Sequence, residues 1–282
     1  MGASQISIVT PSLNQADYLE ETLSSVLCPG YPELEYIVID GASTDGSVDI
    51  IKRYADRLSY WVSESDRGHA HGINKGFGHT SGEIMGWINS SDVYFPWTLE
   101  TVAQVFRDLP DVEWIEGMPA YVDVGRWPMS IDLGFCNRCD LLLGHRGTIQ
   151  QESVFWRRSL WERAGGRLED SLRLACDYEL WLRFSRHAPL YHVSTVLAAF
   201  RFHDDRRGLV SRGDYAQEAR CVRDAELARL SRLERAEVAA LRCVRHSGGP
   251  RVTTLLGRAR VLPWYRYPRI VYDFSGRKWR VV

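Results

Sequence analysis

The chain has 282 residues, a mass of 32.3 kDa and a formal net charge of −1, and 45% of its residues are hydrophobic. These values suit one large α/β domain with an extension, and they exclude a disordered or fibrous protein. No apolar run approaches the roughly 20 residues that cross a bilayer, and the first residues lack the pattern of a signal peptide. We therefore expect a cytoplasmic protein.

The small net charge hides an asymmetry between two parts of the sequence. Residues 1–200 carry 16 Lys and Arg against 27 Asp and Glu, whereas residues 201–282 carry 19 against 9. An acidic part suits a metal ion or a cationic ligand. A basic part suits phosphates, acidic lipids or nucleic acid.

The first 125 residues alternate short apolar runs with helical patterns, which is typical of repeated βαβ units. One run, Glu35–Asp40, is almost continuously apolar, which predicts a central strand of a parallel sheet. The predicted strands are Ile6–Thr10, Glu35–Asp40, Tyr60–Ser63, Glu83–Ile88 and Val112–Ile115, and the predicted helices are Asp17–Cys28, Ser47–Tyr54, Gly72–Gly78 and Pro96–Leu109.

The pattern changes after about residue 125. Residues 123–147 show no clear period, and we predict an irregular stretch there. The later predicted elements are strands Ser153–Trp156 and Val193–Phe202, and helices Ser159–Ala164, Asp177–Arg186 and Asp214–Leu241. We therefore divide the chain into an α/β domain over residues 1–210, with a mostly parallel sheet flanked by helices, and a helical, Arg- and aromatic-rich C-terminal extension over residues 211–282.

Polar residues follow the predicted strands, at the positions where open parallel sheets bind ligands. Asp40 follows the second strand, Asp66 the third and Asp92 the fourth. No Gly-rich phosphate loop follows the first strand, so a phosphate ligand at this edge needs another cation. Mg²⁺ or Mn²⁺, held by one or two carboxylates and by phosphate oxygens, supplies that cation.

The order of these segments resembles that of the inverting glycosyltransferases of family 2, which have a GT-A fold. The joint order is more specific than any single motif. The matching segments are Ile6–Asn14, Val38–Ser47, Ser63–Phe77, Thr80–Asp92, Gln150–Arg158 and Asp177–Arg183. The resemblance implies transfer of a sugar from a nucleotide-diphosphate sugar to a hydroxyl acceptor with inversion, in the assembly of a surface polysaccharide or glycolipid.

The resemblance also implies a role for each matching residue. Four functions are involved: binding of the nucleotide, binding of a divalent metal ion, contact with the acceptor, and general-base catalysis. The nucleotide would contact Pro11, Ser12, Asp40, Asp66, Lys75 and Ser91; Asp92 and His203 would hold Mg²⁺ or Mn²⁺; Gln151 would reach the acceptor; and Asp177 would be the general base.

The metal motif departs from the family pattern, because residues 89–92 (Asn-Ser-Ser-Asp) contain one acid where the family usually has two or three. A nucleotide-sugar-binding module with weak or no turnover is therefore the alternative. A nucleotidyltransferase is a second alternative, but the basic, Gly-rich loop that it needs is absent after the first strand. The candidate residues also have structural readings: Asp40, Asp66 and Asp177 as caps, and Lys75 and His203 as exposed residues.

Arginines and aromatic residues interleave over residues 251–282. This pattern suits the headgroup region of an anionic membrane. It equally suits a helix packed on the catalytic domain with its arginines outward. No nucleic-acid-binding fold accompanies the charge, so we expect a nucleotide-sugar donor and a saccharide or lipid-linked acceptor as partners, and no nucleic acid.

Overall fold

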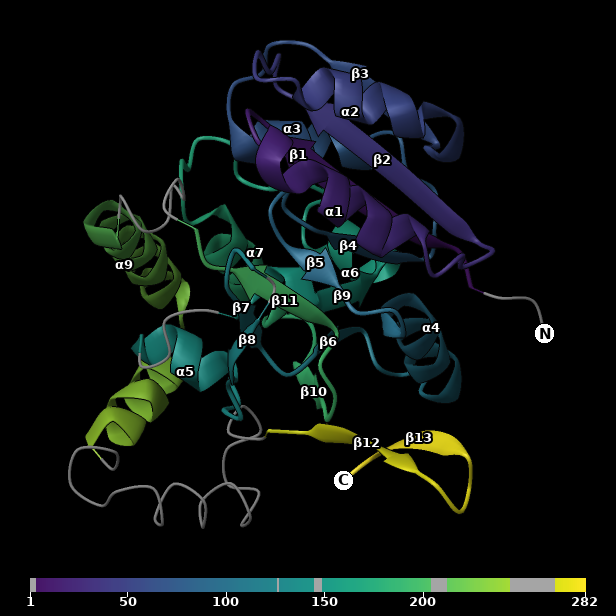
Figure 1. Ribbon diagram of the computed structural model, residues 1–282. Helices are drawn as coiled ribbons and strands as arrows, with labels where there is room; N and C mark the ends of the chain where they lie inside the picture. Colours follow the sequence, from purple (N-terminus) through teal and green to yellow (C-terminus); the bar gives the residue numbers. More distant parts are fainter. Residues whose placement is uncertain (1–3, 126, 145–148, 204–211, 244–266) are drawn as a thin grey trace.

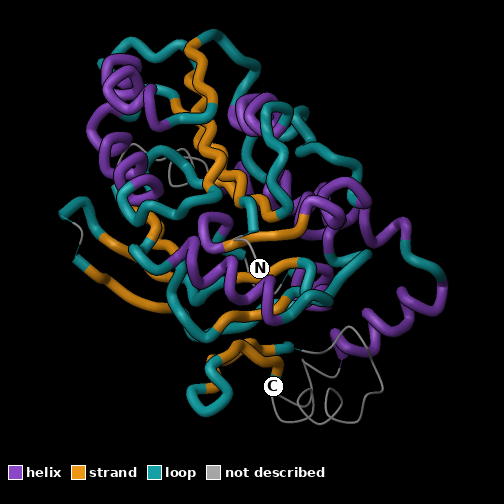
Figure 2. Tube along the Cα trace, turned by 90° about the vertical axis from the view of Figure 1, so that its right-hand side faces the viewer, coloured by secondary structure: helices purple, strands orange, loops and turns teal. Residues whose placement is uncertain are grey.

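A large sheet crosses the molecule with helices packed on it, and a smaller sheet lies beside it (Figures 1 and 2). The computed structural model describes residues 4–125, 127–144, 149–203, 212–243 and 267–282. The strand order is β13-β12-β10-β6-β9-β4-β1-β2-β3 in the large sheet and β5-β11-β7-β8 in the small one. None of the described helices is both long and apolar enough to cross a membrane.

The N-terminal part alternates strands and helices, as its periodicity predicts. Strand β1 pairs in parallel with β2 and β4, and β2 pairs in parallel with β3, so their carboxyl ends meet at one edge. The strands are β1 (Ile6–Ser12), β2 (Leu34–Asp40), β3 (Tyr60–Ser63), β4 (Ile84–Trp87), β5 (Val93–Tyr94) and β6 (Trp114–Glu116). The helices are α1 (Ala16–Leu27), α2 (Ser47–Tyr54), the 3₁₀ turn η1 (Ala55–Arg57), α3 (His69–Phe77) and α4 (Thr98–Asp108).

Side chains of β1 alternate between two hydrophobic cores on the two faces of the large sheet. Ile6 and Ile8 pack into the core that includes α1, α2 and α4, whereas Val9 packs into the core that includes α3 and the helices of the second half. Burial on both faces explains why these strands are almost continuously apolar. Gly76 brings α3 so close to β1 that a Cβ at this position would clash with Val9.

The second half contains more regular structure than its sequence indicates. Its elements are β7 (Ala120–Val122), β8 (Pro128–Ile131), α5 (Arg138–Leu143), η2 (Gln151–Ser153), β9 (Val154–Arg157), α6 (Arg158–Arg163), α7 (Cys176–Phe184), β10 (Tyr191–Val193) and β11 (Ala198–Arg201). The stretch predicted to be irregular thus holds β8 and α5. The strand predicted over residues 193–202 is two strands, β10 in the large sheet and β11 in the small one.

The C-terminal segment is only partly helical. Helix α9 (Arg212–Arg229) is followed by a second helical run over residues 232–243. Ser231 and Glu234 exchange hydrogen bonds at the start of that run, so the single long helix predicted here is two helices. The expectation of helix is wrong for residues 269–281, which form the hairpin of β12 (Arg269–Asp273) and β13 (Lys278–Val281).

The hairpin extends the large sheet, because β12 pairs in parallel with β10 (Figure 1). A pairing with β10 is a contact between distant segments, and no local pattern in the sequence shows it. The predicted domain boundary at residue 210 and most of the basic stretch, residues 244–266, lie outside the described residues.

Candidate active site

The loops after β1 and β2 are tied to each other. The Oδ1 atom of Asn14 accepts a hydrogen bond from Thr44 N at 2.9 Å, and Asn14 N donates to the Ser43 hydroxyl at 2.8 Å. Asn14 and Ala42 both have positive φ, at 52° and 64°. Such conformations cost energy in residues other than glycine and cluster in functional loops, which marks this edge of the sheet as a candidate binding site.

The Asp40 carboxyl group is fully buried at the end of β2. It accepts hydrogen bonds from Ser43 N at 2.9 Å, from the Ser43 hydroxyl at 2.5 Å and from the Ser63 hydroxyl at 2.6 Å. A carboxylate has roughly four acceptor positions. Asp40 therefore shapes the turn, as the structural reading predicts, and keeps one acceptor position for a ligand.

Asp66 lies where the loop after β3 meets the end of β2. Its Oδ1 atom accepts a hydrogen bond from Gly68 N at 2.8 Å. Its Oδ2 atom packs against two glycines, because a Cβ built on Gly41 or on Gly72 would lie 3.1 or 3.2 Å from it. Gly41 directly follows Asp40, so the fold brings the two predicted nucleotide-binding acids to one place.

The other residues predicted to bind the nucleotide differ in their surroundings. Pro11 and Ser12 are buried at the end of β1, and the Ser12 hydroxyl has no hydrogen-bond partner within the described parts of the chain. Ser91 is half-buried in the loop after β4. Lys75 of α3 forms an ion pair with Glu64, which would compete with a phosphate for the ammonium group.

Asp92 is buried in the loop between β4 and β5, and three parts of the chain hold it. Its Oδ1 atom accepts a hydrogen bond from Arg201 N at 3.0 Å, and its Oδ2 atom accepts one from Asn89 Nδ2 at 3.3 Å. Its backbone carbonyl accepts a hydrogen bond from the Thr22 hydroxyl of α1 at 2.8 Å. The carboxyl group therefore has a fixed direction.

Arg201 of β11 holds the same loop, and the sequence analysis did not find it. Its side chain is 1% exposed, donates to the Ser91 carbonyl at 2.8 Å and pairs with Glu21 at 2.7 Å. The Arg201 guanidinium lies over the ring of Tyr18. The ring of His203 also packs against Tyr18, and the centroids of these two rings are 4.6 Å apart. His203 is buried rather than exposed, so its reading as an ordinary surface histidine is wrong.

The oxygen atoms around Asp92 suit a hard divalent cation that is shared with a diphosphate. Asn89 Oδ1 is buried next to this carboxyl group and accepts no hydrogen bond from the described residues. Mg²⁺ is commonly held by one or two carboxylates, and phosphate oxygens and water complete its coordination. Within residues 4–125, 127–144, 149–203, 212–243 and 267–282, no group of three or more His, Cys, Asp or Glu could hold a metal ion. Asp92 and Asn89 thus fit a cation whose remaining ligands come from the donor.

The turn η2 and the residue before it, Gln150, form a row of four consecutive residues that each have an unpartnered buried oxygen. Each of these side-chain atoms is buried and has no hydrogen-bond partner elsewhere in the described structure: Gln150 Oε1, Gln151 Oε1, Glu152 Oε1 and Ser153 Oγ. Buried polar atoms are normally paired, so such a row calls for an explanation. A ligand with several hydroxyl groups would supply the missing donors, which extends the acceptor role predicted for Gln151 to its neighbours.

Glu152 lies near both the candidate metal ligand and the candidate base. Burial raises the pKa of its carboxyl group well above the ordinary value, and the charges of Asp92, Glu116 and Asp177 raise that pKa further. Asp92 and Asp177 therefore both lie within electrostatic range of this one buried side chain. The sequence analysis placed Glu152 within a matching segment but assigned it no role. Its position next to Gln151, the residue predicted to reach the acceptor, could have indicated that Glu152 belongs to the site.

Asp177 lies in the first turn of α7, as predicted. Burial raises the pKa of its carboxyl group to about 6, although backbone hydrogen bonds and the nearby Tyr215 hydroxyl both act to lower it. Desolvation thus outweighs the effect of the helix N-terminus, which by itself would favour the ionised form. A carboxyl group that titrates near 6 can accept a proton at neutral pH more readily than an ordinary aspartate.

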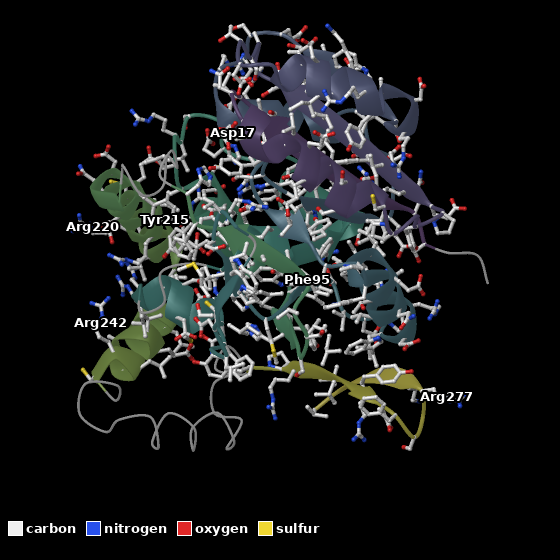
Figure 3. All side chains as sticks on the ribbon, viewed as in Figure 1. Asp17, Phe95, Tyr215, Arg220, Arg242 and Arg277 are labelled. Carbon is white, nitrogen blue, oxygen red and sulfur yellow. The ribbon has the colours of Figure 1, made fainter. Side chains whose placement is uncertain are left out.

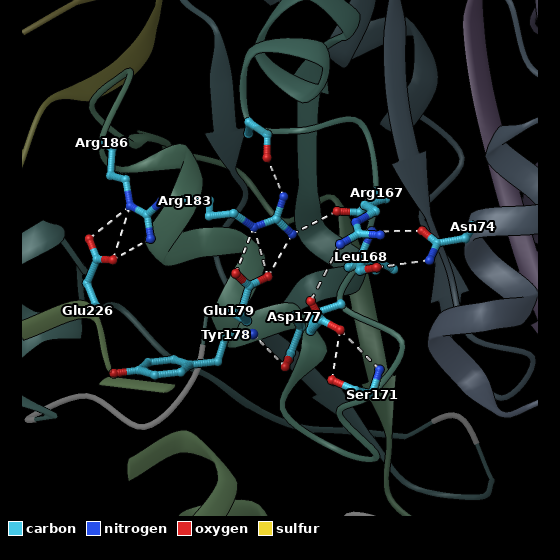
Figure 4. A network of polar contacts seen from close by, with 12 residues as sticks. Asn74, Arg167, Leu168, Ser171, Asp177, Tyr178, Glu179, Arg183, Arg186 and Glu226 are labelled. Carbon is cyan, nitrogen blue, oxygen red and sulfur yellow. Dashed lines mark hydrogen bonds and ion pairs between the residues drawn. The ribbon is translucent and has the colours of Figure 1, made fainter. Parts of the chain in front are cut away.

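Helix α7 is fixed to its surroundings by polar contacts (Figure 4). Arg183 pairs with Glu179 at 2.7 Å and donates to the Arg167 carbonyl at 2.7 Å. The next residue, Leu168, is held through both backbone groups by Asn74 of α3, at 2.9 and 2.7 Å. The loop that precedes α7 is therefore tied to the helix that lies beside Asp66.

The sheet topology is that of the GT-A fold class, and comparison with solved structures confirms this class of fold. Staphylococcus aureus TarS 1–349, in complex with UDP-GlcNAc, superposes with a TM-score of 0.66, at 18% identity, over 92% of this chain and 76% of that one. The mannosyltransferase PcManGT from Pyrobaculum calidifontis, in complex with GDP-Man and Mn²⁺, gives a TM-score of 0.61, at 19% identity, over 93% and 78% of the two chains.

Sequence comparison identifies the family within that class. The model described as "Glycosyl transferase family 2" matches residues 7–174, and the chain belongs to this family.

Curated relatives agree with this assignment. An uncharacterised glycosyltransferase of Rickettsia typhi is 26% identical over 71% of this chain, and one of Mycobacterium tuberculosis is 29% identical over 70%. The aligned part spans 64% of the Rickettsia typhi protein and 75% of the Mycobacterium tuberculosis protein. The resemblance stated from the sequence motifs is thereby confirmed at the level of family and fold.

Proposed function

We propose that this protein transfers a sugar from a nucleotide-diphosphate sugar to a hydroxyl group of an acceptor, with inversion at the anomeric carbon. The observation that carries the proposal is that the carboxyl groups of Asp92 and Asp177, from distant parts of the sequence, both raise the pKa of the buried Glu152. A candidate residue for the diphosphate side and a candidate base thereby lie within electrostatic range of one buried side chain, which supports a shared role in one reaction.

The donor would bind at the carboxyl ends of β1, β2 and β3. The nearby acceptor atoms of Asp40 and Asp66 suit the N–H and O–H groups of a nucleoside. Pro11, Ser12 and Ser91 would contact the same ligand, and Lys75 would do so after leaving Glu64. The ligands in the two solved structures, UDP-GlcNAc and GDP-Man, support a nucleotide-diphosphate sugar as the donor class.

The proposed reaction is a single displacement. The acceptor oxygen attacks the anomeric carbon and passes its proton to the Asp177 carboxylate, while the bond to the nucleoside diphosphate breaks. Asp92 and Asn89, with His203 as a further candidate ligand, would hold Mg²⁺ or Mn²⁺, which when bound neutralises charge that develops on the leaving diphosphate. One base and one direct attack produce inversion.

The acceptor would lie against η2. The unpartnered oxygens of residues 150–153, including that of Gln151, suit a saccharide with several hydroxyl groups, either free or attached to a lipid. We place such a step in the assembly of a surface polysaccharide or glycolipid, in the cytoplasm, with peripheral contact between the basic C-terminal part and the anionic inner face of the membrane. The excess of 19 basic over 9 acidic residues after residue 200 supports this placement.

A nucleotide-sugar-binding module with little turnover is the second candidate. Two observations favour it: the metal motif has a single carboxylate, and Lys75 is paired with Glu64. This candidate shares donor binding with the first and differs only in the chemical step. Experiments on binding and on turnover therefore have to be done separately.

We expect one nucleoside diphosphate to raise the melting temperature of the protein, and to do so more strongly with Mn²⁺. A ligand that binds only the native state stabilises it by mass action, by about 2.7 kcal/mol at 100 times its Kd. Thermal-shift measurements with UDP, GDP and TDP, with and without Mn²⁺, check this. Asp92→Asn is expected to lose the Mn²⁺-dependent part, whereas Asp111→Asn, which changes an exposed acid far from the strand ends, should keep it.

Release of nucleoside diphosphate from the matching sugar donor then separates the two candidates. Release that depends on Asp92 supports the transferase. Donor binding without release, across uridine, guanosine and thymidine donors and a range of saccharide acceptors, supports the binding module. A protein that none of the three diphosphates stabilises would contradict both.

We also expect the ratio kcat/KM to fall at acid pH, with an apparent pKa near 6. Asp177 can accept a proton only when it is ionised, and burial raises its pKa to about 6, so activity is lost as the pH falls through that value and is level above it. Initial rates between about pH 5 and about pH 8 at limiting donor check this. A profile that stays level down to pH 5 would assign the base to another group.

A further inference from the structure

Helix α9 follows the α/β domain in sequence, yet it packs directly on the helix that carries Asp177. Figure 1 shows α9 beside α7, and the two helices are in contact. Tyr215, Ala219 and Val222, which recur at helical spacing, pack against the hydrophobic core that contains α7. One face of α9 therefore packs on the core that surrounds α7, the helix of the candidate base.

Glu218 on this face binds the backbone at the start of α7. Its Oε1 atom accepts a hydrogen bond from Arg173 N at 3.2 Å, and its Oε2 atom accepts hydrogen bonds from Leu174 N at 2.8 Å and Ala175 N at 3.0 Å. Although burial acts to raise it, the pKa of this carboxyl group is lowered by these three hydrogen bonds and by the charge of Arg173. The group is thus ionised and bound to the backbone at neutral pH.

The contacts of Glu218 lie just before the first turn of α7. The residue that precedes the helix is Ala175, which has no side chain that could cap it. Glu218 instead accepts hydrogen bonds from the N–H groups of the three residues that lead into the helix. Asp177 lies two residues further on, so the carboxylate that fixes the approach to α7 also fixes the position of the candidate base.

Tyr215 lies one turn before Glu218 and faces the base itself. Figure 3 shows Tyr215 on the side of α9 that faces the body of the protein, whereas Arg220 lies on the opposite side. The Tyr215 hydroxyl is buried and lies beside the Asp177 carboxyl group, outside regular hydrogen-bond geometry. In this arrangement the hydroxyl already acts to lower the pKa of the Asp177 carboxyl group.

A second acidic residue of α9, Glu226, anchors the helix nearer its C-terminal end. Its side chain is 3% exposed and forms ion pairs with Arg138 of α5 at 3.1 Å and with Arg186, just after α7. Figure 4 shows the pair of Glu226 and Arg186 at the far end of α7 from Asp177. Tyr215 and Glu218 of α9 thus lie at the start of α7, near Asp177. Glu226 holds the other end of α7.

We propose that α9 is a positioning element of the active site, in which Glu218 fixes the start of α7 and the Tyr215 hydroxyl orients the Asp177 carboxylate for proton transfer. The proposal rests on the proposed role of Asp177 as the general base. It makes residues 212–229 part of the catalytic unit instead of an appendage to it.

The first test is Tyr215→Phe, which keeps the packed ring and removes the hydroxyl. A hydrogen bond to the ionised carboxylate lowers its pKa, so its loss should move the acid limb of kcat/KM upward by about half a unit to one unit. The other titratable groups that face Asp177 are Glu152 of η2 and Cys176 of α7, and neither is changed. An unmoved limb would overturn the role of Tyr215.

The second test is Glu218→Gln, which removes the charge and one of the two acceptor oxygens. We expect kcat to fall by about tenfold to a hundredfold, because small displacements of a catalytic group have effects of this size, while the KM for the donor changes little. Asp224→Asn removes an exposed carboxylate from the outer face of the same helix and is the matched control. A kcat equal to that of the control would overturn the role of Glu218.

Glu226→Gln separates positioning from general stability. This variant should lower the melting temperature, because it breaks buried ion pairs, without moving the acid limb of the pH profile. Tyr215→Phe should instead move the acid limb and should not lower the melting temperature. If Glu226→Gln moved the limb as much as Tyr215→Phe, the effect would be general loosening of α9, and the proposal would be wrong.

A measurement without turnover distinguishes failure of this proposal from failure of the proposed function. The Asp177 carboxyl carbon can be titrated by ¹³C NMR and assigned by its absence in Asp177→Asn. Its pKa should rise in Tyr215→Phe whether or not sugar is transferred. A raised NMR pKa in a protein that turns over no donor would refute the transferase and keep the contact, whereas active protein with an unchanged NMR pKa would refute the contact alone.

Discussion

Asp177→Asn is expected to lower kcat by about 10²–10⁴-fold, the usual contribution of a general base. Asparagine has the same shape and can still accept the hydrogen bond from Tyr178 N, which is 2.7 Å long in the native protein. It cannot accept the proton of the acceptor hydroxyl. Steady-state kcat and KM for both substrates check this, with the exposed Asp111→Asn as control; the KM for the donor should stay within a few-fold.

The same substitution is expected to raise the melting temperature at pH 7. The pKa of the Asp177 carboxyl group is raised from 3.8 to about 6 in the folded protein, mainly by burial, so the native state holds the proton more tightly than the unfolded state. This preference is lost as the pH rises through 6, and at pH 7 the buried charge destabilises the fold. Below about pH 3.5, where the group is protonated in both states, the two proteins should differ little.

A catalytic Asp177 should therefore give a variant that is less active and more stable than the native protein. Active sites commonly contain buried charged groups that lower the free energy of unfolding. An inactive Asp177→Asn protein that is also less stable at pH 7 would instead indicate structural damage. Full activity in a folded Asp177→Asn protein would remove this residue from the mechanism.

Arg201→Met is expected to lower the free energy of unfolding by about 1–3 kcal/mol, because it leaves a partly buried carbonyl without a donor and removes the buried partner of Glu21, which is 28% exposed. The guanidinium is 1% exposed, and its loss leaves the Ser91 carbonyl and Glu21 without their hydrogen bonds from it. Urea unfolding measures the change. Because the same side chain holds the loop of Asp92, the Mn²⁺-dependent thermal shift should be lost as well.

The neighbouring surface pair provides a matched control. Arg53 pairs with Glu20 at 2.9 Å, and both side chains are 54% exposed. Exposed pairs contribute little, so Arg53→Met should change the free energy of unfolding by no more than about 0.5 kcal/mol. Similar effects of Arg201→Met and Arg53→Met would mean that the Asp92 loop is held by its other contacts.

Local order was predictable from the sequence because it depends on neighbours along the chain. The helix Ser47–Tyr54 and the strand Tyr60–Ser63 have the predicted bounds. The apolar run that ends at Asp40 is β2, an internal strand, but it lies next to the edge strand β3 and not at the centre of the sheet. In a parallel sheet the carboxyl ends of strands share one edge. For this reason Asp40 and Asp66 could be predicted to lie together from their positions alone.

Elements whose place depends on distant partners could not be predicted in this way. The apolar residues between 193 and 202 belong to two different sheets, and the strands of residues 269–281 exist because β12 pairs with β10. In both places the local pattern is compatible with several structures. The pairing partner, many residues away, selects one of them.

The same division applies to the candidate site. The amino-acid sequence by itself determined the family, the βαβ order and which carboxylates stand at strand ends, because these follow from short-range patterns and motif order. Only the tertiary structure decided that Arg201 holds the Asp92 loop, that the charges of Asp92 and Asp177 both act on the buried Glu152, and that Glu218 of α9 binds the backbone that leads into α7. These roles depend on burial and on hydrogen bonds between segments that are far apart in the sequence. The residues adjacent to Arg201, Glu152 and Glu218 along the chain do not predict either.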